Sequence, residues 1–229
     1  MIQTIIVTGS EGNLGTEICQ YLDKKYNVIH CDLQLGHDLT DENFVKSFFK
    51  ENPAKYLLNL YALNPHVDND ESVNIFDISL SSMDSYLKVN LTSLFSVCRE
   101  FAKVNEDGAI VNLSSTYGIV SPHQDIYEEG KEKHIGYSVS KAAVVHLSKC
   151  MAISLAPKIR VNCIAPGGVG FVPSSKSSEK FIKLYEKQTP MGRMMKKDEL
   201  NGIIEYLCSE KSSYCTGGVF NVDGGWTSW

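Results

Sequence analysis

The sequence predicts an α/β fold in which helices cover both faces of a mainly parallel sheet. Short apolar runs, rich in β-branched residues, alternate along the chain with segments of helical periodicity. Such alternation is typical of β-α-β units, whose strands run parallel. The apolar runs are nearly continuous, as expected for strands that are buried on both faces. We therefore expect a doubly wound sheet.

Each element is predicted from its own pattern. The segments expected as strands are residues 2–8, 27–31, 56–60, 108–113, 159–164 and 218–222. The segments expected as helices are residues 14–24, 41–50, 83–104, 137–156, 180–187 and 197–208. In the first helix Ile18, Tyr21 and Leu22 share one face, and the second begins with Asp41, a residue favoured at a helix start.

Length and composition indicate one ordinary domain. The chain has 229 residues, 43% of them hydrophobic, and shows neither a repeat nor a linker, so we expect a single domain over residues 1–229. The 22 Lys and Arg against 27 Asp and Glu leave a net charge of −5, which provides no basic excess for nucleic acid. No apolar stretch approaches the roughly 18 residues of a membrane span.

The N-terminal segment and the cysteines predict a cytoplasmic protein. Residues 1–12 do not read as a secretory signal, because they carry neither a basic region nor a long apolar one. The cysteines are scattered without metal-ligand spacing, so we expect buried reduced thiols and no metal site. They are Cys19, Cys31, Cys98, Cys150, Cys163, Cys208 and Cys215.

A glycine-rich turn lies between the first strand and the first helix. Residues 8–15 read TGSEGNLG, and such a turn lets backbone N–H groups and a helix N-terminus approach a pyrophosphate. The second strand ends at Asp32, whose carboxylate can accept hydrogen bonds from ribose hydroxyls and repels a 2′-phosphate. Because Glu11 adds a second negative group nearby, we expect a Rossmann-type fold that binds NAD rather than NADP.

Further motifs follow in a fixed order along the chain. They are the turn with Thr8, Gly9, Gly12 and Gly15, then Asp38-Leu39, Asn59 in 59–62, Asn90 in 90–95, Ser115 in 111–115, Tyr137 with Lys141, Pro166-Gly167 in 160–167, and 221–225. Together they resemble the short-chain dehydrogenase/reductase family over nearly the whole chain. In 59–62 the family usually has Asn-Asn-Ala-Gly, from which Tyr61 and Ala62 depart.

The resemblance implies an NAD(P)-dependent oxidoreductase acting on CH–OH groups, with Asn90, Ser115, Tyr137 and Lys141 as catalytic residues. Lys141 would also contact the nicotinamide ribose, and Asn90 would hold a water in a proton relay. The residues implied in cofactor binding are Gly9, Ser10, Glu11, Gly12, Asn13, Leu14, Gly15, Asp32, Asp38, Leu39, Asn59, Ala62, Tyr137, Lys141, Pro166, Gly167 and Val169. The family is commonly tetrameric through its two long helices, so we expect a homodimer or homotetramer.

The chemistry of the signature pair follows from its spacing. Tyr137 and Lys141 lie one helical turn apart, and a cation beside a phenol lowers the phenol pKa. Ser115 can hydrogen-bond the substrate oxygen, and the family register favours it over Ser114. Tyr127 is also followed four residues later by a lysine, but its two neighbouring carboxylates oppose phenolate formation, so we favour Tyr137 as the acid/base.

The stretch between Ser115 and Tyr137 is long and strongly polar, which favours a small polar substrate. The insert over 121–135 resembles enzymes linked to activated-sugar and nonulosonic-acid pathways, so we expect a sugar or sugar nucleotide; a role as a lid or assembly contact stays open. The alternatives are a 3-oxoacyl-thioester reductase-like enzyme and a non-catalytic dinucleotide sensor. The three histidines His123, His134 and His146 are interpreted as surface or substrate-loop residues.

Two features of the chain ends and crossovers complete the prediction. The five residues between Asp32 and Asp38 replace the helix and strand that the family usually has there, so we expect a shortened crossover with a residual strand at residues 37–39. In the family strand order 3-2-1-4-5-6-7 that strand lies at the edge. The terminal Trp226 and Trp229 are expected to pack across a subunit interface.

Overall fold

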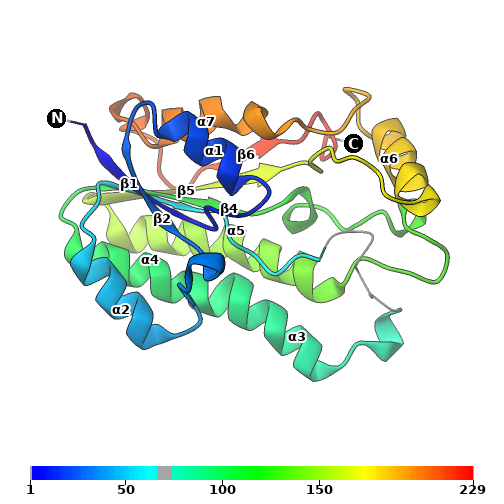
Figure 1. Ribbon diagram of the computed structural model, residues 1–229, viewed down its shortest axis with the longest axis horizontal. Helices are drawn as coiled ribbons and strands as arrows, with labels where there is room; N and C mark the ends of the chain where they lie inside the picture. Colours follow the sequence, from blue (N-terminus) through cyan, green and yellow to red (C-terminus); the bar gives the residue numbers. More distant parts are fainter. Residues whose placement is uncertain (1, 66–73, 229) are drawn as a thin grey trace.

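The computed structural model describes residues 2–65 and 74–228. They form a six-stranded, fully parallel sheet in the order β2-β1-β3-β4-β5-β6 (Figure 1). The strands are β1 (Thr4–Thr8), β2 (Asn27–Cys31), β3 (Tyr56–Asn59), β4 (Gly108–Leu113), β5 (Ile159–Pro166) and β6 (Val219–Val222). The predicted α/β doubly wound fold is confirmed.

Helices cover the sheet on both faces, with α1 and α7 on one and α2, α4 and α5 on the other (Figure 1). The α-helices of the described residues are α1 (Gly15–Leu22), α2 (Glu42–Glu51), α3 (Leu80–Leu87), α4 (Ser93–Val104), α5 (Ile135–Leu155), α6 (Lys176–Gln188) and α7 (Asn201–Leu207). Successive strand residues point to opposite faces. Ile6 therefore packs in the apolar cluster that contains Phe101 of α4, whereas Ile5 packs in the cluster that contains Ile18 of α1.

The single helix expected over residues 83–104 is interrupted in the middle. Helix α3 ends at Leu87, a π-helical turn spans Lys88–Thr92, and α4 begins at Ser93. Such one-turn π-helical bulges are frequent at functional sites. Periodicity alone does not reveal this turn, because the residues around it keep their apolar helical spacing.

The crossover after β2 is short, as predicted. The prediction of a residual strand at residues 37–39 is wrong, because these residues form no strand. A three-residue 3₁₀ turn, Leu33–Leu35, follows Asp32, and Gly36 then adopts a left-handed conformation with φ of 82°. The backbone groups are satisfied within this turn, because the N–H of His37 donates to the carbonyl of Asp32 (3.1 Å). Strand β2 therefore forms the edge of the sheet.

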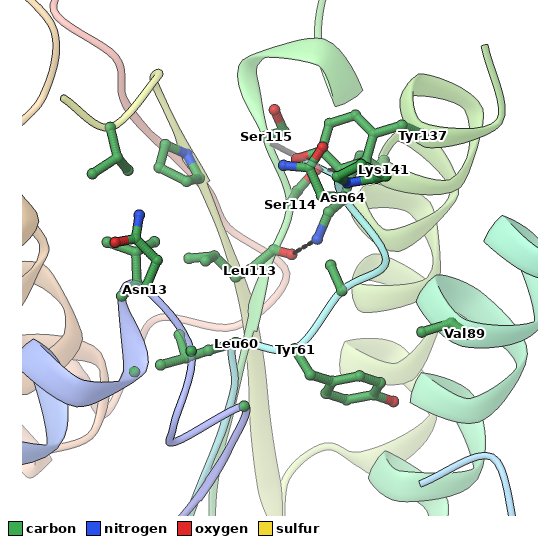
Figure 2. Close-up of a pocket in the computed structure, with 18 of the residues that line it drawn as sticks. Asn13, Leu60, Tyr61, Asn64, Val89, Leu113, Ser114, Ser115, Tyr137 and Lys141 are labelled. Atoms are coloured by element: carbon green, nitrogen blue, oxygen red, sulfur yellow. Dashed lines mark hydrogen bonds between the residues drawn. The ribbon is translucent and has the colours of Figure 1, made fainter. Parts of the chain in front are cut away.

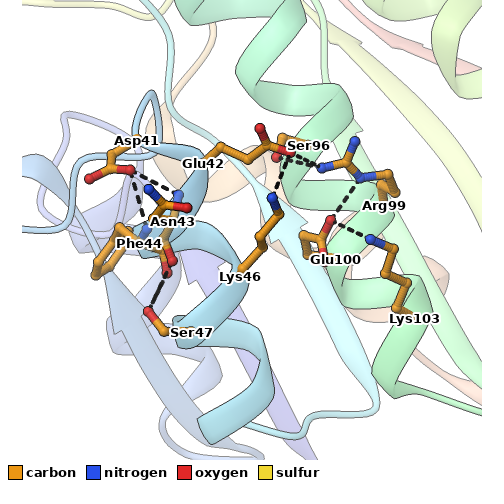
Figure 3. A network of polar contacts seen from close by, with 10 residues as sticks. All are labelled: Asp41, Glu42, Asn43, Phe44, Lys46, Ser47, Ser96, Arg99, Glu100 and Lys103. Atoms are coloured by element: carbon orange, nitrogen blue, oxygen red, sulfur yellow. Dashed lines mark hydrogen bonds and ion pairs between the residues drawn. The ribbon is translucent and has the colours of Figure 1, made fainter.

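Helix α2 is fastened to α4 by a chain of charged groups (Figure 3). The guanidinium of Arg99 donates both to Glu42 of α2 (2.5 Å) and to Glu100 of its own helix (2.7 Å). Lys103 donates to the same carboxylate of Glu100 (2.8 Å), and Lys46 pairs with Glu42 (3.3 Å). Glu100 is nearly buried, so its two basic partners compensate its lost hydration.

The terminal segment packs against its own chain. Trp226 is 2% exposed, and its ring stacks on Tyr185 of α6 with centroids 4.2 Å apart. The expected position of Trp226 across a subunit interface is therefore wrong; Trp229 lies outside the described residues. Most cysteines are buried free thiols, but Cys150 is exposed and Cys215 half-buried, which corrects that expectation.

Two further findings concern membranes and metals. Within residues 2–65 and 74–228, no helix is long and apolar enough to cross a membrane. In the same part of the chain, no three His, Cys, Asp or Glu side chains gather as a metal ion would need.

Candidate active site

A cavity of about 880 Å³ opens at the carboxyl ends of the strands. Strand β1 pairs with β2 on one side and β3 on the other, so the chain reverses its winding direction here. Ligands of open parallel sheets bind at such a reversal. The cavity extends from the glycine-rich turn to α6, and Figure 2 shows Asn13 on one side and Tyr137 on the other.

The glycine-rich turn is packed too tightly for side chains at two positions. A Cβ on Gly9, which has φ of +74°, would lie 2.5 Å from the backbone nitrogen of Tyr61, and one on Gly15 would lie 2.0 Å from the carbonyl oxygen of Gly9. No side chain caps the first turn of α1. The turn therefore brings backbone N–H groups of the α1 N-terminus to the cavity, the arrangement that suits a pyrophosphate.

The predicted residues of the turn divide into two groups. Gly9, Gly12, Asn13, Leu14 and Gly15 line the cavity. The other two, Ser10 and Glu11, are absent from the cavity lining. The Ser10 hydroxyl donates to the Glu11 carboxylate (3.0 Å), which also lies 3.3 Å from Nδ1 of His30. The Glu11 carboxylate is thus held beside His30 of strand β2. The backbone N–H of Glu11, and not its carboxylate, contacts Asp32.

Asp32 lines the cavity at the end formed by the segment after β2, where the adenine ribose of a dinucleotide is expected (the ribose end), and is 8% exposed. Its two carboxylate oxygens accept from the backbone N–H groups of Glu11 (3.1 Å) and Gln34 (2.9 Å). Asp38 and Leu39 line the same end. Hydrogen bonds from the backbone and hydroxyl of Thr40 lower the pKa of Asp38, so this carboxylate stays ionised. The pair of acids presents acceptors for hydroxyl groups.

Asn59 does not line the cavity, although the sequence places it in the cofactor motif. Its amide oxygen accepts from the Thr8 hydroxyl (2.9 Å) and its nitrogen donates to Asn112 (2.8 Å). Asn59 is buried and links β1, β3 and β4, so its side chain holds the strand ends together. Ala62 does line the cavity, as predicted.

Tyr61, the departure from the family motif, points away from Tyr137 and Lys141 and toward the helices around Val89 (Figure 2). Its phenol lies 2.8 Å from the hydroxyl of Ser93, the first residue of α4, and burial raises its pKa. The tyrosine anchors the loop after β3 to α4, and the backbone around Gly9 packs directly against it.

Ser115, Tyr137 and Lys141 converge at the other end of the cavity (Figure 2). Tyr137 and Lys141 come from the first turns of α5, and the ammonium of Lys141 lies 5.9 Å from the centre of the Tyr137 ring. The Ser115 hydroxyl interacts with the Tyr137 phenol, whereas the Ser114 hydroxyl donates to the backbone carbonyl of Lys141 (2.7 Å). Both serines line the cavity, but only the Ser115 hydroxyl is directed at Tyr137, because the Ser114 hydroxyl is engaged with the backbone of α5.

The expected lowering of the Tyr137 pKa by Lys141 is wrong for this arrangement. Burial raises the pKa of Tyr137, and the hydrogen bond with Ser115 offsets part of that rise. The Lys141 ammonium instead donates to the carbonyl of Leu113 (2.8 Å; Figure 2), and burial lowers its pKa to about 8. Both groups are removed from water, and this loss of hydration is the largest cause of both shifts.

Asn90 lies in the π-helical turn and is absent from the cavity lining. Its amide clamps the backbone of Leu63, accepting from the N–H (2.6 Å) and donating to the carbonyl (3.1 Å). It also donates to the Ser140 hydroxyl on α5 (3.0 Å). Asn90 therefore holds the loop after β3 against α5 at Ser140, the residue before Lys141.

Aromatic side chains form the wall beyond Tyr137. They are Tyr117, Tyr127, Phe171, Phe181 and Tyr185, with Met194 beside them. The Tyr127 phenol donates to the Tyr117 phenol (3.2 Å), and Lys131, its apparent signature partner, pairs instead with Glu128 (3.1 Å). Tyr127 thus contributes its phenol to the wall, and Lys131 is engaged with Glu128.

The polar insert 121–135 and the histidine His134 differ from what the sequence predicts. In the insert 121–135 only Tyr127 and Lys133 are among the residues lining the cavity. His134 is buried: its Nδ1 accepts from the Gly136 N–H at the start of α5, and its ring stacks on Tyr86 at 4.4 Å. His134 is therefore not a surface residue, which leaves its interpretation as a residue of the substrate loop, whereas His123 and His146 are exposed.

Sequence reasoning missed several cavity residues. Asn64 lines the cavity and is labelled in Figure 2, and Gln34 and His37 line the ribose end. Lys133, four residues before Tyr137 and just before α5 begins, also lines the cavity. Pro166, Gly167 and Val169 after β5 line the cavity as predicted.

Comparison with known proteins assigns the chain to a family. The family model described as enoyl-(acyl carrier protein) reductase matches residues 5–227. The chain belongs to the short-chain dehydrogenase/reductase family. It is therefore an oxidoreductase that acts on CH–OH groups of small molecules with an NAD(P) cofactor. The tight glycine turn and the acceptors of Asp32 fit such a dinucleotide.

Relatives of this short-chain dehydrogenase/reductase cover almost its whole length. It is 29% identical over 226 residues to 3-oxoacyl-[acyl-carrier-protein] reductase FabG of Aquifex aeolicus, covering 97% of this chain and 86% of that protein. It is also 29% identical to nodulation protein G of Azospirillum brasilense, covering 96% of each. The structure of a Leptospira borgpetersenii short-chain dehydrogenase with bound NAD+ matches with a TM-score of 0.86 and 27% identity, covering 99% and 93% of the two chains.

Proposed function

We propose that residues 1–229 act as a single NAD(H)-dependent oxidoreductase domain that interconverts a secondary alcohol and a ketone. The observation that supports this most is the shared cavity: Ser115, Tyr137 and Lys141 lie at one end, and the glycine turn and Asp32 at the other. When bound, the nicotinamide supplies the hydride donor or acceptor. The protein supplies binding, orientation and the proton.

Each catalytic side chain has a separate task in this proposal. The Tyr137 phenol gives a proton to the substrate oxygen during reduction and takes it back during oxidation. The Ser115 hydroxyl hydrogen-bonds the same oxygen as its charge changes. Lys141 supplies positive charge near the phenol and contacts the nicotinamide ribose. Asn90 acts as a positioning residue, because its side chain holds the Leu63 backbone.

NAD is the proposed cofactor because the ribose end of the cavity is acidic. Asp32 and Asp38 line it, and in the described part of the chain no Lys or Arg lines this end. A carboxylate there accepts from ribose hydroxyls and repels a 2′-phosphate. A relative of known structure, at 27% identity, carries NAD+.

The proposed substrate is a small polar molecule, of which a sugar or sugar nucleotide is the leading class. The wall combines rigid aromatic faces with the phenols of Tyr117 and Tyr127 and the amide of Asn64. Such a mixture of large apolar contacts and few polar groups orients a polar ligand. A second candidate is a 3-oxoacyl thioester, which is favoured by the names of the relatives from Aquifex aeolicus and Thermotoga maritima.

Assembly into a homodimer or homotetramer is part of the proposal. Helices α4 and α5 expose apolar side chains, among them Phe95 and Ile153, the latter 82% exposed. Burying such side chains against a second copy removes them from water. Light scattering at micromolar concentration should therefore give at least twice the 25.4 kDa chain mass.

A spectrophotometric screen tests the proposed function. NADH consumption at 340 nm is followed with a panel of ketoses, nucleotide-activated ketosugars, 3-oxoacyl thioesters and simple ketones, and NADH formation with the corresponding alcohols. Turnover confined to the sugar members supports the first candidate, and turnover confined to thioesters supports the second. Tight NADH binding without turnover across the panel would favour a non-catalytic dinucleotide sensor.

A further inference from the structure

Tyr185 of α6 is a buried phenol to which the chemistry proposed above gives no role. The residue is 3% exposed and lines the cavity, and burial raises its pKa to about 12, so the hydroxyl stays protonated. Trp226, from the segment after β6, stacks on the ring with centroids 4.2 Å apart. A Cβ on Gly168 would lie 2.8 Å from Cζ of the same ring, so the Gly168 backbone and the ring are in direct contact. Close packing therefore holds the phenol in place.

The hydroxyl of Tyr185 joins two loops that extend beyond the sheet. Its oxygen accepts from the backbone N–H of Gly168 (2.5 Å), in the loop after β5. It also shares a hydrogen bond with the side chain of Thr116, in the loop after β4. The pairing of β4 with β5 ends at Leu113 and Ile164, before either of these residues is reached. The Tyr185 hydroxyl thus connects the two loops where the pairing of the strands has ended.

The two loops carry different parts of the site. Thr116 directly follows Ser115, whose hydroxyl interacts with the Tyr137 phenol. Gly168 belongs to residues 166–169, all of which line the cavity. Hydride transfer requires the nicotinamide to lie beside the substrate carbon, and small displacements of reacting groups lower rates steeply. A contact that sets the spacing of these loops therefore affects the reaction itself.

We propose that Tyr185 is a positioning residue whose hydroxyl holds the Gly168 loop against the Ser115 loop, so that nicotinamide and substrate keep a reactive spacing. This inference rests on the proposed oxidoreductase function and assigns to it a residue of α6. The side chain acts through Gly168 and Thr116, because its oxygen already contacts both groups. Loss of the hydroxyl should weaken binding of the nicotinamide part of the cofactor and spare the adenosine part, which is expected near Asp32.

The binding test compares NADH with ADP-ribose, which has the same adenosine diphosphate and lacks the nicotinamide. Both dissociation constants are measured by calorimetry for the parent, Tyr185→Phe and the control Tyr26→Phe. The Tyr26 hydroxyl also hydrogen-bonds a backbone group, the carbonyl of Cys208 (3.1 Å), and burial raises its pKa to about 12 as well. Tyr26 is nevertheless a remote control, because it is not among the described residues that line the cavity.

The expected result is a selective loss of affinity. Tyr185→Phe should raise the Kd of NADH about 3- to 10-fold and that of ADP-ribose by less than about twofold, because one hydrogen bond of modest net strength is lost at the Gly168 loop. Tyr26→Phe should match the parent with both ligands. This arm needs no substrate, so it gives a result whichever ketone the enzyme uses.

Turnover provides a second arm. With any ketone of the panel above that the parent reduces, Tyr185→Phe should lower kcat about 10- to 100-fold and leave KM for the ketone within about threefold. Thr116→Val removes one partner of the hydroxyl. The double variant should lose little more than the weaker of the two single variants, because both changes break the same connection.

Fluorescence of Trp226 separates positioning from a general loss of structure. The chain has two tryptophans, so Trp229→Phe leaves Trp226 as the single reporter, and its ring stacks on the ring of residue 185. Unchanged emission and an unchanged thermal melt in Tyr185→Phe would show that the packing of the ring is retained. If Tyr185→Phe does not fold, Thr116→Val takes its place in the binding test, with the same selective loss expected for NADH.

The outcomes separate this inference from the proposed function. If no ketone of the panel is reduced but NADH affinity is lost selectively, the inference stands and the proposed function fails for these substrates. Equal weakening of NADH and ADP-ribose, or no weakening of either, would overturn the inference even with full turnover. A raised KM with unchanged kcat and NADH affinity would place the Tyr185 hydroxyl against the substrate and also overturn it.

Discussion

Replacing the carboxylate of Asp32 should change which dinucleotide the enzyme prefers. Asp32 is 8% exposed and lies where the adenine ribose is expected, so a 2′-phosphate there would face a negative charge in partly dehydrated surroundings. For two unit charges about 5 Å apart, an effective dielectric constant of about 20 gives roughly 3 kcal/mol of repulsion. This corresponds to a preference of roughly 100-fold for NADH over NADPH.

Asp32→Asn removes the repulsion and weakens the hydrogen bonds to the ribose. We expect NADPH binding to tighten by up to about 100-fold and NADH binding to weaken by about tenfold, so that the preference inverts. Dissociation constants are measured by the fluorescence of NADH and NADPH on binding. Glu11→Gln is the matched control, because the Glu11 carboxylate faces His30 outside the cavity lining.

Two results would refute this reasoning. A parent enzyme that binds NADPH more tightly than NADH would show that Asp32 does not face the 2′ position. An unchanged preference in Asp32→Asn, together with a changed one in Glu11→Gln, would transfer the selection to Glu11. A thermal melt of each variant checks that the turn after Asp32 stays folded, because the Asp32 carboxylate accepts the Gln34 N–H of this turn.

The remaining predictions concern catalysis, the α2–α4 contact and pH. Tyr137→Phe should abolish NADH turnover, whereas Tyr127→Phe should keep most of it. Loss of turnover in Tyr127→Phe but not in Tyr137→Phe would refute the assignment of Tyr137 as the acid/base. Arg99→Ala should lower the free energy of unfolding in urea by about 1–2 kcal/mol, because it leaves the nearly buried Glu100 with one partner, against under about 0.5 for Lys46→Ala on the surface. Burial raises the pKa of Cys208 from 9.0 to about 12, so the native state keeps a proton that the unfolded chain releases. This contribution to the free energy of unfolding is fully present below pH 9 and falls by about 1.4 kcal/mol per pH unit up to about pH 12. When the free energy of unfolding in urea is measured between pH 8 and 10, it should fall less steeply with pH for Cys208→Ala than for the parent. Equal pH dependence of the two proteins would contradict this prediction.

Local patterns in the sequence were enough to predict most of the fold and the two ends of the site. Continuous apolar runs mark strands that are buried on both faces, so all six strands are predicted to within two residues at each end. The spacing of Tyr137 and Lys141 predicts that they are neighbours on one helix. The positions of the glycine turn and Asp32, after the first and second strands, predict that these two features lie close together. These contacts depend on periodicity and on strand-to-helix connection alone.

The features that could not be predicted depend on contacts distant in sequence. The π-helical turn goes with the clamp of Asn90 on Leu63, 27 residues earlier. The direction of the Tyr137 pKa depends on how completely the assembled fold excludes water. The insert looked uniformly polar, and only packing of α5 against its neighbours decides that Lys133 turns inward while Glu128 stays at the surface.

The short turn after β2 makes the ribose end unusually open to redesign. Residues 33–37 pair with no strand, so lengthening them changes a surface loop without moving any strand out of register. Loop extension costs little conformational entropy, about 0.6 kcal/mol for each doubling of length. If Asp32 and its turn select the cofactor as proposed, grafting loops here should exchange that specificity, while Ser115 after β4 and Tyr137 and Lys141 on α5 stay untouched.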